Sequence, residues 1–267
     1  LYADGLARHH YLQAILGITD KYRQLFGHLQ LAWDVNAKWE ALVPSANNNP
    51  CPLMLWRALV TLAFLWGWID FGILLLLGFP AMMRPGEMSR SKVLELVLPR
   101  HFLYGFHFLL LTVPDPKNRR LFARRCHRRV EARLIVYVVS TWSIGLPGDR
   151  LIFGGGLPWM RRCWMALCKH LGVDVSQSRG VTLASLRGGG ATALYLFGAS
   201  IADIAWCGGW ASTRRLEIYI QEVAALTSLK DLRPADQARI SLFADALPRI
   251  LRDYVTNNSQ RGVSPPA

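Results

Sequence analysis

The segment ASLRGGGATALYLFGASIADIAWCGGWASTRRLEIYIQEV (184–223) decides the fold of this chain. It reads as helix, turn, helix, turn and helix, with Arg187 near its beginning. A Gly-Trp step at Gly209 and Trp210 follows, and Tyr219 comes nine residues after the tryptophan on the next predicted helix. One arginine, one indole and one phenol therefore share a single run of short helices.

Side chains of these kinds suit phosphoryl transfer, which depends mainly on charge placed around the phosphate. A second arginine, Arg84, lies far upstream in MMRPGEM (82–88). Two arginines can hold the non-bridging oxygens of a phosphate in a bidentate way that lysine cannot. Tyr219 could then act as the nucleophile, provided that another group delivers a proton to the leaving oxygen.

The order and spacing of five short motifs resemble the tyrosine recombinase (phage-integrase-like) family. The motifs are an Arg-Pro-x-Glu helix start, a lysine on a hairpin, a His-x-x-Arg box, a Gly-Trp step and a tyrosine nine residues on. They are matched by RPGE (84–87), Lys117 in PDPKNRR, ASLR (184–187), Gly209 with Trp210, and Tyr219. The resemblance covers about residues 50–255 and is most specific over 180–223.

The resemblance implies a site-specific DNA recombinase or integrase. Tyr219 would attack the scissile phosphate and form a 3′-phosphotyrosyl link, while Arg84 and Arg187 stabilise the transition state. Lys117 would protonate the leaving oxygen, and Trp210 would support the site. The implied partner is double-stranded DNA, with self-association on it and with no metal, no cofactor and no membrane. A mobile-element protein inside the cell, nuclear in a eukaryote, is the implied setting.

The chain departs from the family at the first position of the His-x-x-Arg box. Ala184 stands where the family has histidine, and a methyl group cannot transfer protons. Three glycines (188–190) also follow Arg187, each costing a helix about 0.8–1 kcal/mol of propensity. These features keep open an alternative, a recombinase-fold protein that binds DNA but no longer cleaves it.

Each candidate residue also has a purely structural interpretation. Arg84 could be a surface residue at a helix start, and Lys117 a solvated residue in a polar turn. Trp210 could be core, and Tyr219 could pack with the apolar residues beside it. Only the joint pattern favours a catalytic site.

The charge of the chain favours a polyanionic partner. Its 267 residues carry a formal net charge of +13, and residues 84–134 hold twelve Lys or Arg against four acids. The same stretch contains RRLFARRCHRR (119–129). We expect its arginines to contact DNA phosphates, which position DNA without specifying sequence. They are Arg119, Arg120, Arg124, Arg125, Arg128 and Arg129.

An apolar stretch at residues 53–83 offers a second alternative, a membrane-associated protein. Arg57 and Asp70 interrupt it and Pro80 closes it, so that its uncharged pieces are shorter than the ~20 residues of a membrane span. Two consecutive buried helices, broken around Gly67 to Phe71, fit better. Asp70 should then lie at a helix end or pair with a cation.

The five cysteines form no Cys-x-x-Cys pair, and the seven histidines show no zinc-type spacing with them. This pattern predicts buried, reduced thiols and no metal site.

The predicted fold class is mostly α with a small antiparallel β-sheet (α+β). A breaker cluster, SANNNPCP (45–52), separates a partial helical core-binding domain (1–46) from a catalytic domain (47–255), and 256–267 should be a disordered tail. Strands are expected at 94–98, 106–113 and about 124–130, with a turn at 113–120. Helices are expected at 130–142 and 157–173, around a loop with one short extended piece.

Overall fold

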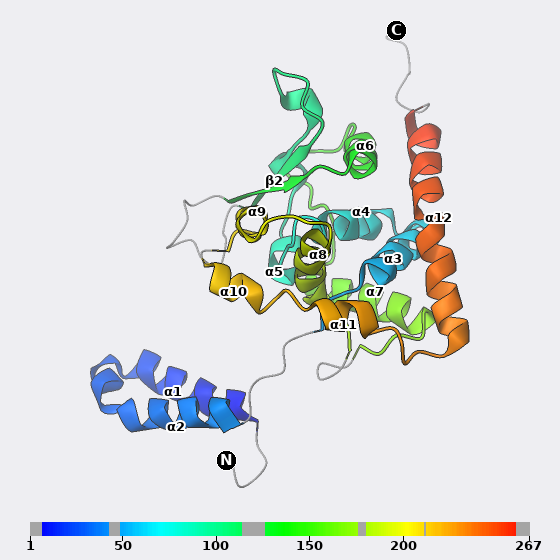
Figure 1. The fold of residues 1–267 in the computed structure, drawn as a ribbon. Coiled ribbons are helices and arrows are strands. Elements are labelled where there is room, and N and C mark those ends of the chain that lie inside the picture. Colours follow the sequence, from blue (N-terminus) through cyan, green and yellow to red (C-terminus); the bar gives the residue numbers. More distant parts are fainter. Residues whose placement is uncertain (1–6, 43–48, 114–125, 176–179, 211, 260–267) are drawn as a thin grey trace. The chain divides into compact units, whose positions relative to one another are not determined.

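The computed structural model describes residues 7–42, 49–113, 126–175, 180–210 and 212–259 (Figure 1). Lys117 therefore lies outside the described residues, as does the turn predicted at 113–120 apart from its first residue. The chain divides into two compact units, Leu1–Asn47 and Asn48–Ala267. The roles expected of the two domains stay predictions.

The first unit is a pair of helices, as the sequence predicts. Helix α1 (Arg8–Lys21) and helix α2 (Gln30–Leu42) are joined by the 3-10 helix η1 (Arg23–His28). Ile15 and Trp39 are buried between them. Arg8 on α1 forms an ion pair with Glu40 on α2 at 2.9 Å.

The apolar stretch forms two buried helices, α3 (Leu53–Leu65) and α4 (Ile69–Gly78). The chain turns between them at Gly67, whose φ of 73° favours glycine. Asp70 lies in the first turn of α4, where it accepts hydrogen bonds from Arg150 at 2.6 Å and from the Trp142 indole at 2.9 Å. Both the break and the pairing of Asp70 are confirmed. Among the described residues, no helix has the length and apolar character needed to cross a membrane.

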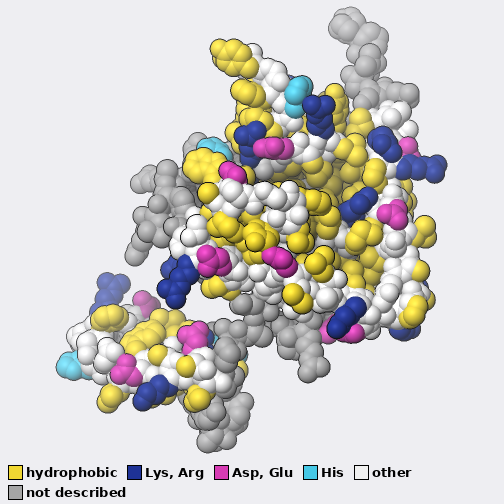
Figure 2. All heavy atoms as spheres, viewed as in Figure 1, with side chains coloured by type: hydrophobic (Ala, Val, Ile, Leu, Met, Phe, Trp, Pro, Cys, Tyr) yellow, Lys and Arg dark blue, Asp and Glu magenta, His cyan; other side chains and the backbone are white. Residues whose placement is uncertain are grey.

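A three-stranded antiparallel sheet has the order β1-β2-β3: β1 (Leu96–Val97), β2 (Leu109–Val113) and β3 (Cys126–Val130). The first strand is shorter than predicted because 93–95 form a 3-10 turn, held by the Lys92 N–H that donates to the Glu95 carboxylate at 2.9 Å. The β1–β2 connection carries exposed hydrophobic side chains at its tip, at the top of Figure 2. Among them is Leu103, which is 97% exposed.

The remaining named elements in the described part of the second unit are helices, and the predicted fold class is confirmed (Figure 1). Helix α12 (Pro234–Ser259) packs against α3 and against α6 (Arg133–Trp142), and it continues four residues into the segment predicted to be disordered. The loop before α7 contains the expected extended piece, where Leu151 pairs with Lys92. These helices are α5 (Pro85–Met88), η3 (Pro99–His101), α6 (Arg133–Trp142), α7 (Gly156–His170), α8 (Ser185–Leu196), α9 (Ile201–Gly208), α10 (Thr213–Glu217), α11 (Glu222–Thr227) and α12 (Pro234–Ser259).

The triple glycine lies inside α8, and close packing requires two of its members, Gly189 and Gly190. A Cβ atom on Gly189 would collide with the backbone carbonyl of Cys51, and one on Gly190 with the carbonyl of Phe79. The Cys51 N–H also donates to the Ser185 carbonyl at 2.9 Å. The glycines thus let α8 lie directly against the start of α3 and the end of α4, which fixes where Arg187 emerges.

Candidate active site

Arg84 is held by a carboxylate three residues further on. It is the N-cap of α5, with Pro85 in the first helical position and Glu87 in the third. Glu87 accepts the Arg84 backbone N–H at 2.9 Å and its guanidinium at 2.7 Å. The side chain of Arg84 is 25% exposed and that of Glu87 only 3%. The buried Glu87 carboxylate therefore fixes the orientation of the partly exposed Arg84 side chain.

Arg187, in the first turn of α8, is 2% exposed. Its guanidinium donates to the carbonyls of Met82 and Gly208, the latter at 2.9 Å, and stacks over the Trp210 ring at 3.7 Å from the centroid. Its buried Nε has no hydrogen-bond partner among the described residues. Met82 has a φ of 49°, an unusual value for a residue other than glycine. Arg187 therefore fixes a strained backbone just before Arg84.

Trp210 and Tyr219 complete the same cluster. Helix α9 is capped by Gly209, whose left-handed φ of 58° redirects the chain, and the Trp210 N–H donates back to the Ala205 carbonyl at 2.9 Å. Trp210 is 7% exposed. Its ring meets that of Tyr219 edge to face, with centroids 5.3 Å apart.

Tyr219 is half-buried and lies in the turn after α10, two residues past the end of that helix, although the sequence predicts it on a helix. Its ring centroid is 5.7 Å from the Arg187 guanidinium carbon. Thr192 on α8 donates its hydroxyl to the Tyr219 carbonyl at 3.0 Å and accepts the Gln221 N–H at 3.2 Å. Helix α8 thus positions both the arginine and the tyrosine.

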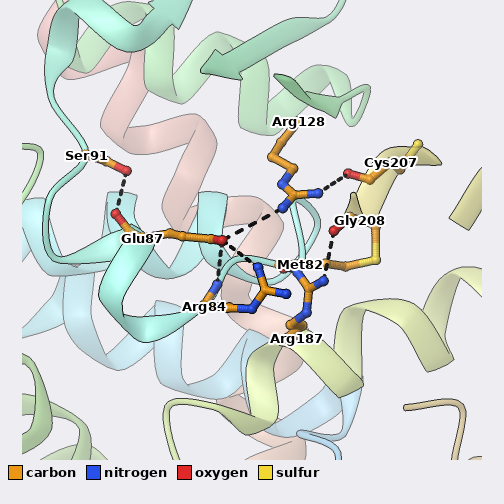
Figure 3. Close-up of polar contacts among 8 residues, drawn as sticks. All are labelled: Met82, Arg84, Glu87, Ser91, Arg128, Arg187, Cys207 and Gly208. Atoms are coloured by element: carbon orange, nitrogen blue, oxygen red, sulfur yellow. Dashed lines mark hydrogen bonds and ion pairs between the residues drawn. The ribbon is translucent and has the colours of Figure 1, made fainter. Parts of the chain in front are cut away.

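Arg128 belongs to this cluster and not to the surface. It is fully buried on β3, although the sequence predicts a contact with DNA. Its guanidinium donates to the Cys207 carbonyl at 3.4 Å and lies 3.9 Å from the Glu87 carboxylate (Figure 3). Arg129, the next residue, is exposed, pairs with Glu131 at 2.8 Å and covers the Phe108 ring. Strand alternation sends the two arginines to opposite faces of the sheet.

The cluster holds three guanidinium groups around one carboxylate (Figure 3). Burial, with the neighbouring charges of Arg84 and Arg128, lowers the pKa of Arg187 to about 9. Burial by itself raises the pKa of Glu87, but the Arg84 backbone N–H and the charges of Arg128 and Arg84 outweigh it and hold that pKa below its ordinary value. The surplus of positive charge makes the cluster suited to binding an anion.

Four of the predicted catalytic residues therefore come together: Arg84, Arg187, Trp210 and Tyr219. Lys117 is outside the described residues, as are four of the predicted DNA contacts: Arg119, Arg120, Arg124 and Arg125. Ala184 is the N-cap of α8 and brings no polar side chain. Arg128 is predicted to contact DNA, and not to belong to the catalytic cluster, because residues 119–129 look like one charged run in the sequence. The alternation of Arg128 and Arg129 along a strand was the available signal.

Comparison with known proteins supports the fold. No family model and no curated protein matches the chain. Among solved structures, it is similar to XerA recombinase, with a TM-score of 0.50 and 17% identity over 86% of this chain and 85% of that one. It is also similar to XerH site-specific recombinase bound to its difH substrate, with a TM-score of 0.44 and 16% identity over 70% of this chain and 53% of that one. The chain has the fold of the tyrosine recombinases.

Proposed function

We propose that this protein cleaves and rejoins DNA through a tyrosine–phosphate intermediate, as a site-specific recombinase or integrase. The observation that carries the proposal is the convergence of Arg84, Arg187, Trp210 and Tyr219 around a buried surplus of positive charge. Arg84 and Tyr219 are partly exposed, so they would meet the DNA first, and Arg187 would act from inside.

In the proposed reaction, the Tyr219 hydroxyl oxygen bonds to the scissile phosphorus as the bond from phosphorus to the 5′ oxygen breaks. The phenol proton would pass to solvent water, and Lys117 would give a proton to the 5′ oxygen. Arg84 and Arg187 stabilise the negative charge of the transition state. A 5′-hydroxyl of a second strand then reverses the step, and the phosphotyrosyl link conserves the bond energy meanwhile.

Duplex DNA would be held by the exposed Arg129 and by the arginines of the β2–β3 connection, Arg119, Arg120, Arg124 and Arg125. Contacts of this kind are with phosphates and set the register of the protein on the duplex. Self-association on DNA and a mobile-element origin belong to the same proposal.

The test is a covalent adduct. The protein is incubated with a pool of nicked duplexes that carry a randomised segment, and adducts that survive detergent are collected. The parent chain should form them. Tyr219→Phe should form none while keeping its DNA affinity, because it loses only the hydroxyl. Arg187→Ala should form them about 10²–10³-fold more slowly, the typical cost of one lost transition-state donor. A parent chain that forms no adduct contradicts the cleavage proposal.

The role of Lys117 has its own test. A substrate with sulfur in place of the bridging 5′ oxygen has a leaving group that needs no proton. Lys117→Ala should be slowed about 10²–10⁴-fold on ordinary DNA, the usual contribution of a positioned acid, and should recover on the sulfur substrate. Equal losses on both substrates would show that Lys117 acts in another way.

Ala184 supports a second candidate function, DNA binding without cleavage. In that case the fold and the positive charge remain, but the proton-transferring side chain of the His-x-x-Arg box is gone. Binding of the randomised duplexes without any adduct would favour this candidate.

A further inference from the structure

Arg128 lies at a junction between two halves of the site. One half is α5, which carries Arg84 and Glu87. The other is the turn after α9, which carries Trp210. The Arg128 guanidinium contacts Glu87 on one side and the Cys207 carbonyl on the other (Figure 3).

The backbone of the α9 turn is shaped to admit this guanidinium. Gly209 has a φ of 58°, and a Cβ atom there would collide with the Arg128 guanidinium. The carbonyl of Gly208, one residue earlier, accepts a hydrogen bond from Arg187. The guanidinium groups of Arg128 and Arg187, which come from different elements, thus bind the consecutive carbonyls of Cys207 and Gly208. Trp210 lies two residues further along the chain.

We infer that Arg128 is a positioning residue for strand cleavage: it keeps the Glu87 carboxylate in place to aim Arg84, and it fixes the turn that carries Trp210. This inference rests on the proposed function. It gives a buried role to a residue that belongs to none of the five motifs of the sequence. The Arg128 guanidinium contacts Glu87 and the Cys207 carbonyl, so it would act on the site through these groups.

The inference predicts a change in pH dependence. The charged groups around Glu87 are Arg84 on α5, Arg128 on β3 and Arg187 on α8. Removing the charge of Arg128 from a buried carboxylate favours its protonated form. Protonated Glu87 no longer holds Arg84 by an ion pair. Cleavage should therefore fail at a higher pH in the variant than in the parent as the solution is acidified.

The experiment compares Arg128→Met and Arg128→Lys with the parent, by single-turnover adduct formation between pH 4 and pH 9. Arg128→Met should cleave about 10²-fold more slowly, comparable to the loss of one preorganised donor, with DNA affinity within about threefold. Its acid limb should move to higher pH. Arg128→Lys keeps a positive charge beside Glu87, but its ammonium cannot donate in two directions from one plane as a guanidinium does. This variant should therefore cleave slowly, while the acid limb of its pH profile stays where it is in the parent.

Arg150→Met is the matched control, because it breaks an arginine–carboxylate pair with Asp70 outside the site. It should keep the parent rate and pH profile. A parent-like rate and acid limb in Arg128→Met would overturn the inference, as would an equal loss at every pH, which a general packing defect would give.

A second measurement separates this inference from the proposed function. If the parent forms no adduct, the cleavage proposal fails, but the contact with Glu87 can still be tested by a double-mutant cycle of Glu87→Gln and Arg128→Met in chemical unfolding. Contacting residues are coupled, so the two effects on the unfolding equilibrium constant should depart from additivity by about threefold or more. Additive effects would overturn the positioning role.

Discussion

At the scale of single residues, the two arginines that would hold the phosphate are themselves held in different ways. Arg84 is oriented by Glu87, three residues away, and this pairing is visible in the sequence as Arg-Pro-x-Glu. Arg187 is oriented by the carbonyls of Met82 and Gly208, which lie 105 and 21 residues away. Backbone carbonyls leave no signature in a sequence. The first arrangement could therefore be predicted, and the second could not.

Glu87 should make the stability of the fold dependent on pH. Its native pKa is below the ordinary value, so its contribution is complete above the unfolded-state pKa and is lost as the pH falls through the lower native pKa. Glu87→Gln leaves buried guanidinium groups without their counter-ion, which typically costs about 3–5 kcal/mol. Urea unfolding from pH 7 to pH 2.5 should show that the difference in unfolding free energy between the parent and Glu87→Gln shrinks at the acid end. A difference that is constant with pH would contradict the prediction.

Introducing at position 184 the histidine of the His-x-x-Arg box tests whether the lack of this side chain limits the proposed reaction. Ala184→His should raise the rate of adduct formation, because a positioned acid–base group typically contributes about 10²–10⁴-fold. The measurement is single-turnover cleavage of the selected duplex. If only the variant forms an adduct, the natural chain is a DNA-binding protein that has lost cleavage. No gain in an active parent would mean that its proton transfer is complete without this group.

At the scale of elements, α8 positions the site because two of its glycines allow backbones to touch. Alanine at a helical glycine usually stabilises by about 0.5–1 kcal/mol, but at Gly189 and Gly190 the new methyl would meet a carbonyl. Overpacking of this kind typically costs about 1–3 kcal/mol. Gly189→Ala and Gly190→Ala should therefore lower the midpoint of urea unfolding.

Gly188→Ala is the internal control for that prediction. A Cβ atom on Gly188 would have only ordinary contacts, the nearest at 3.6 Å from the Tyr219 carbonyl. This variant should be neutral or more stable than the parent. If all three variants behave alike, close approach is not the reason for the triple glycine.

The elements differ in how far the sequence could predict them. The break between α3 and α4 follows from charges and a glycine within one short stretch, and it was predicted. The shortening of β1 depends on a local bond between Lys92 and Glu95, which periodicity does not reveal. Helix propensity counts the triple glycine as a loss of stability because it describes an isolated helix. The packing partners that require glycine, Cys51 and Phe79, come from distant positions in the sequence.

At the scale of the whole molecule, the net charge of +13 predicts that DNA binding is electrostatic. If the protein neutralises about 6–10 phosphates, its affinity should fall by roughly 10³–10⁵ between 50 and 200 mM salt. Replacing Arg124, Arg125 and Arg129 with Ala should flatten this slope. Arg128→Met should leave it unchanged, since a buried guanidinium releases no counterions from DNA. Fluorescence titration at several salt concentrations measures the slope, and an unchanged slope in the triple variant would place the DNA contacts elsewhere.

The double hydrogen bond of Arg187 also has a consequence for the order in which a ribosome makes this chain. The Met82 carbonyl leaves the exit tunnel early, the guanidinium follows 105 residues later, and the Gly208 carbonyl comes 21 residues after that. Until Gly208 arrives, Arg187 lacks the second of its two carbonyl partners, and the clamp on the strained peptide at Met82 is incomplete. We therefore expect the complete set of Arg187 contacts to form only after Gly208 has been synthesised.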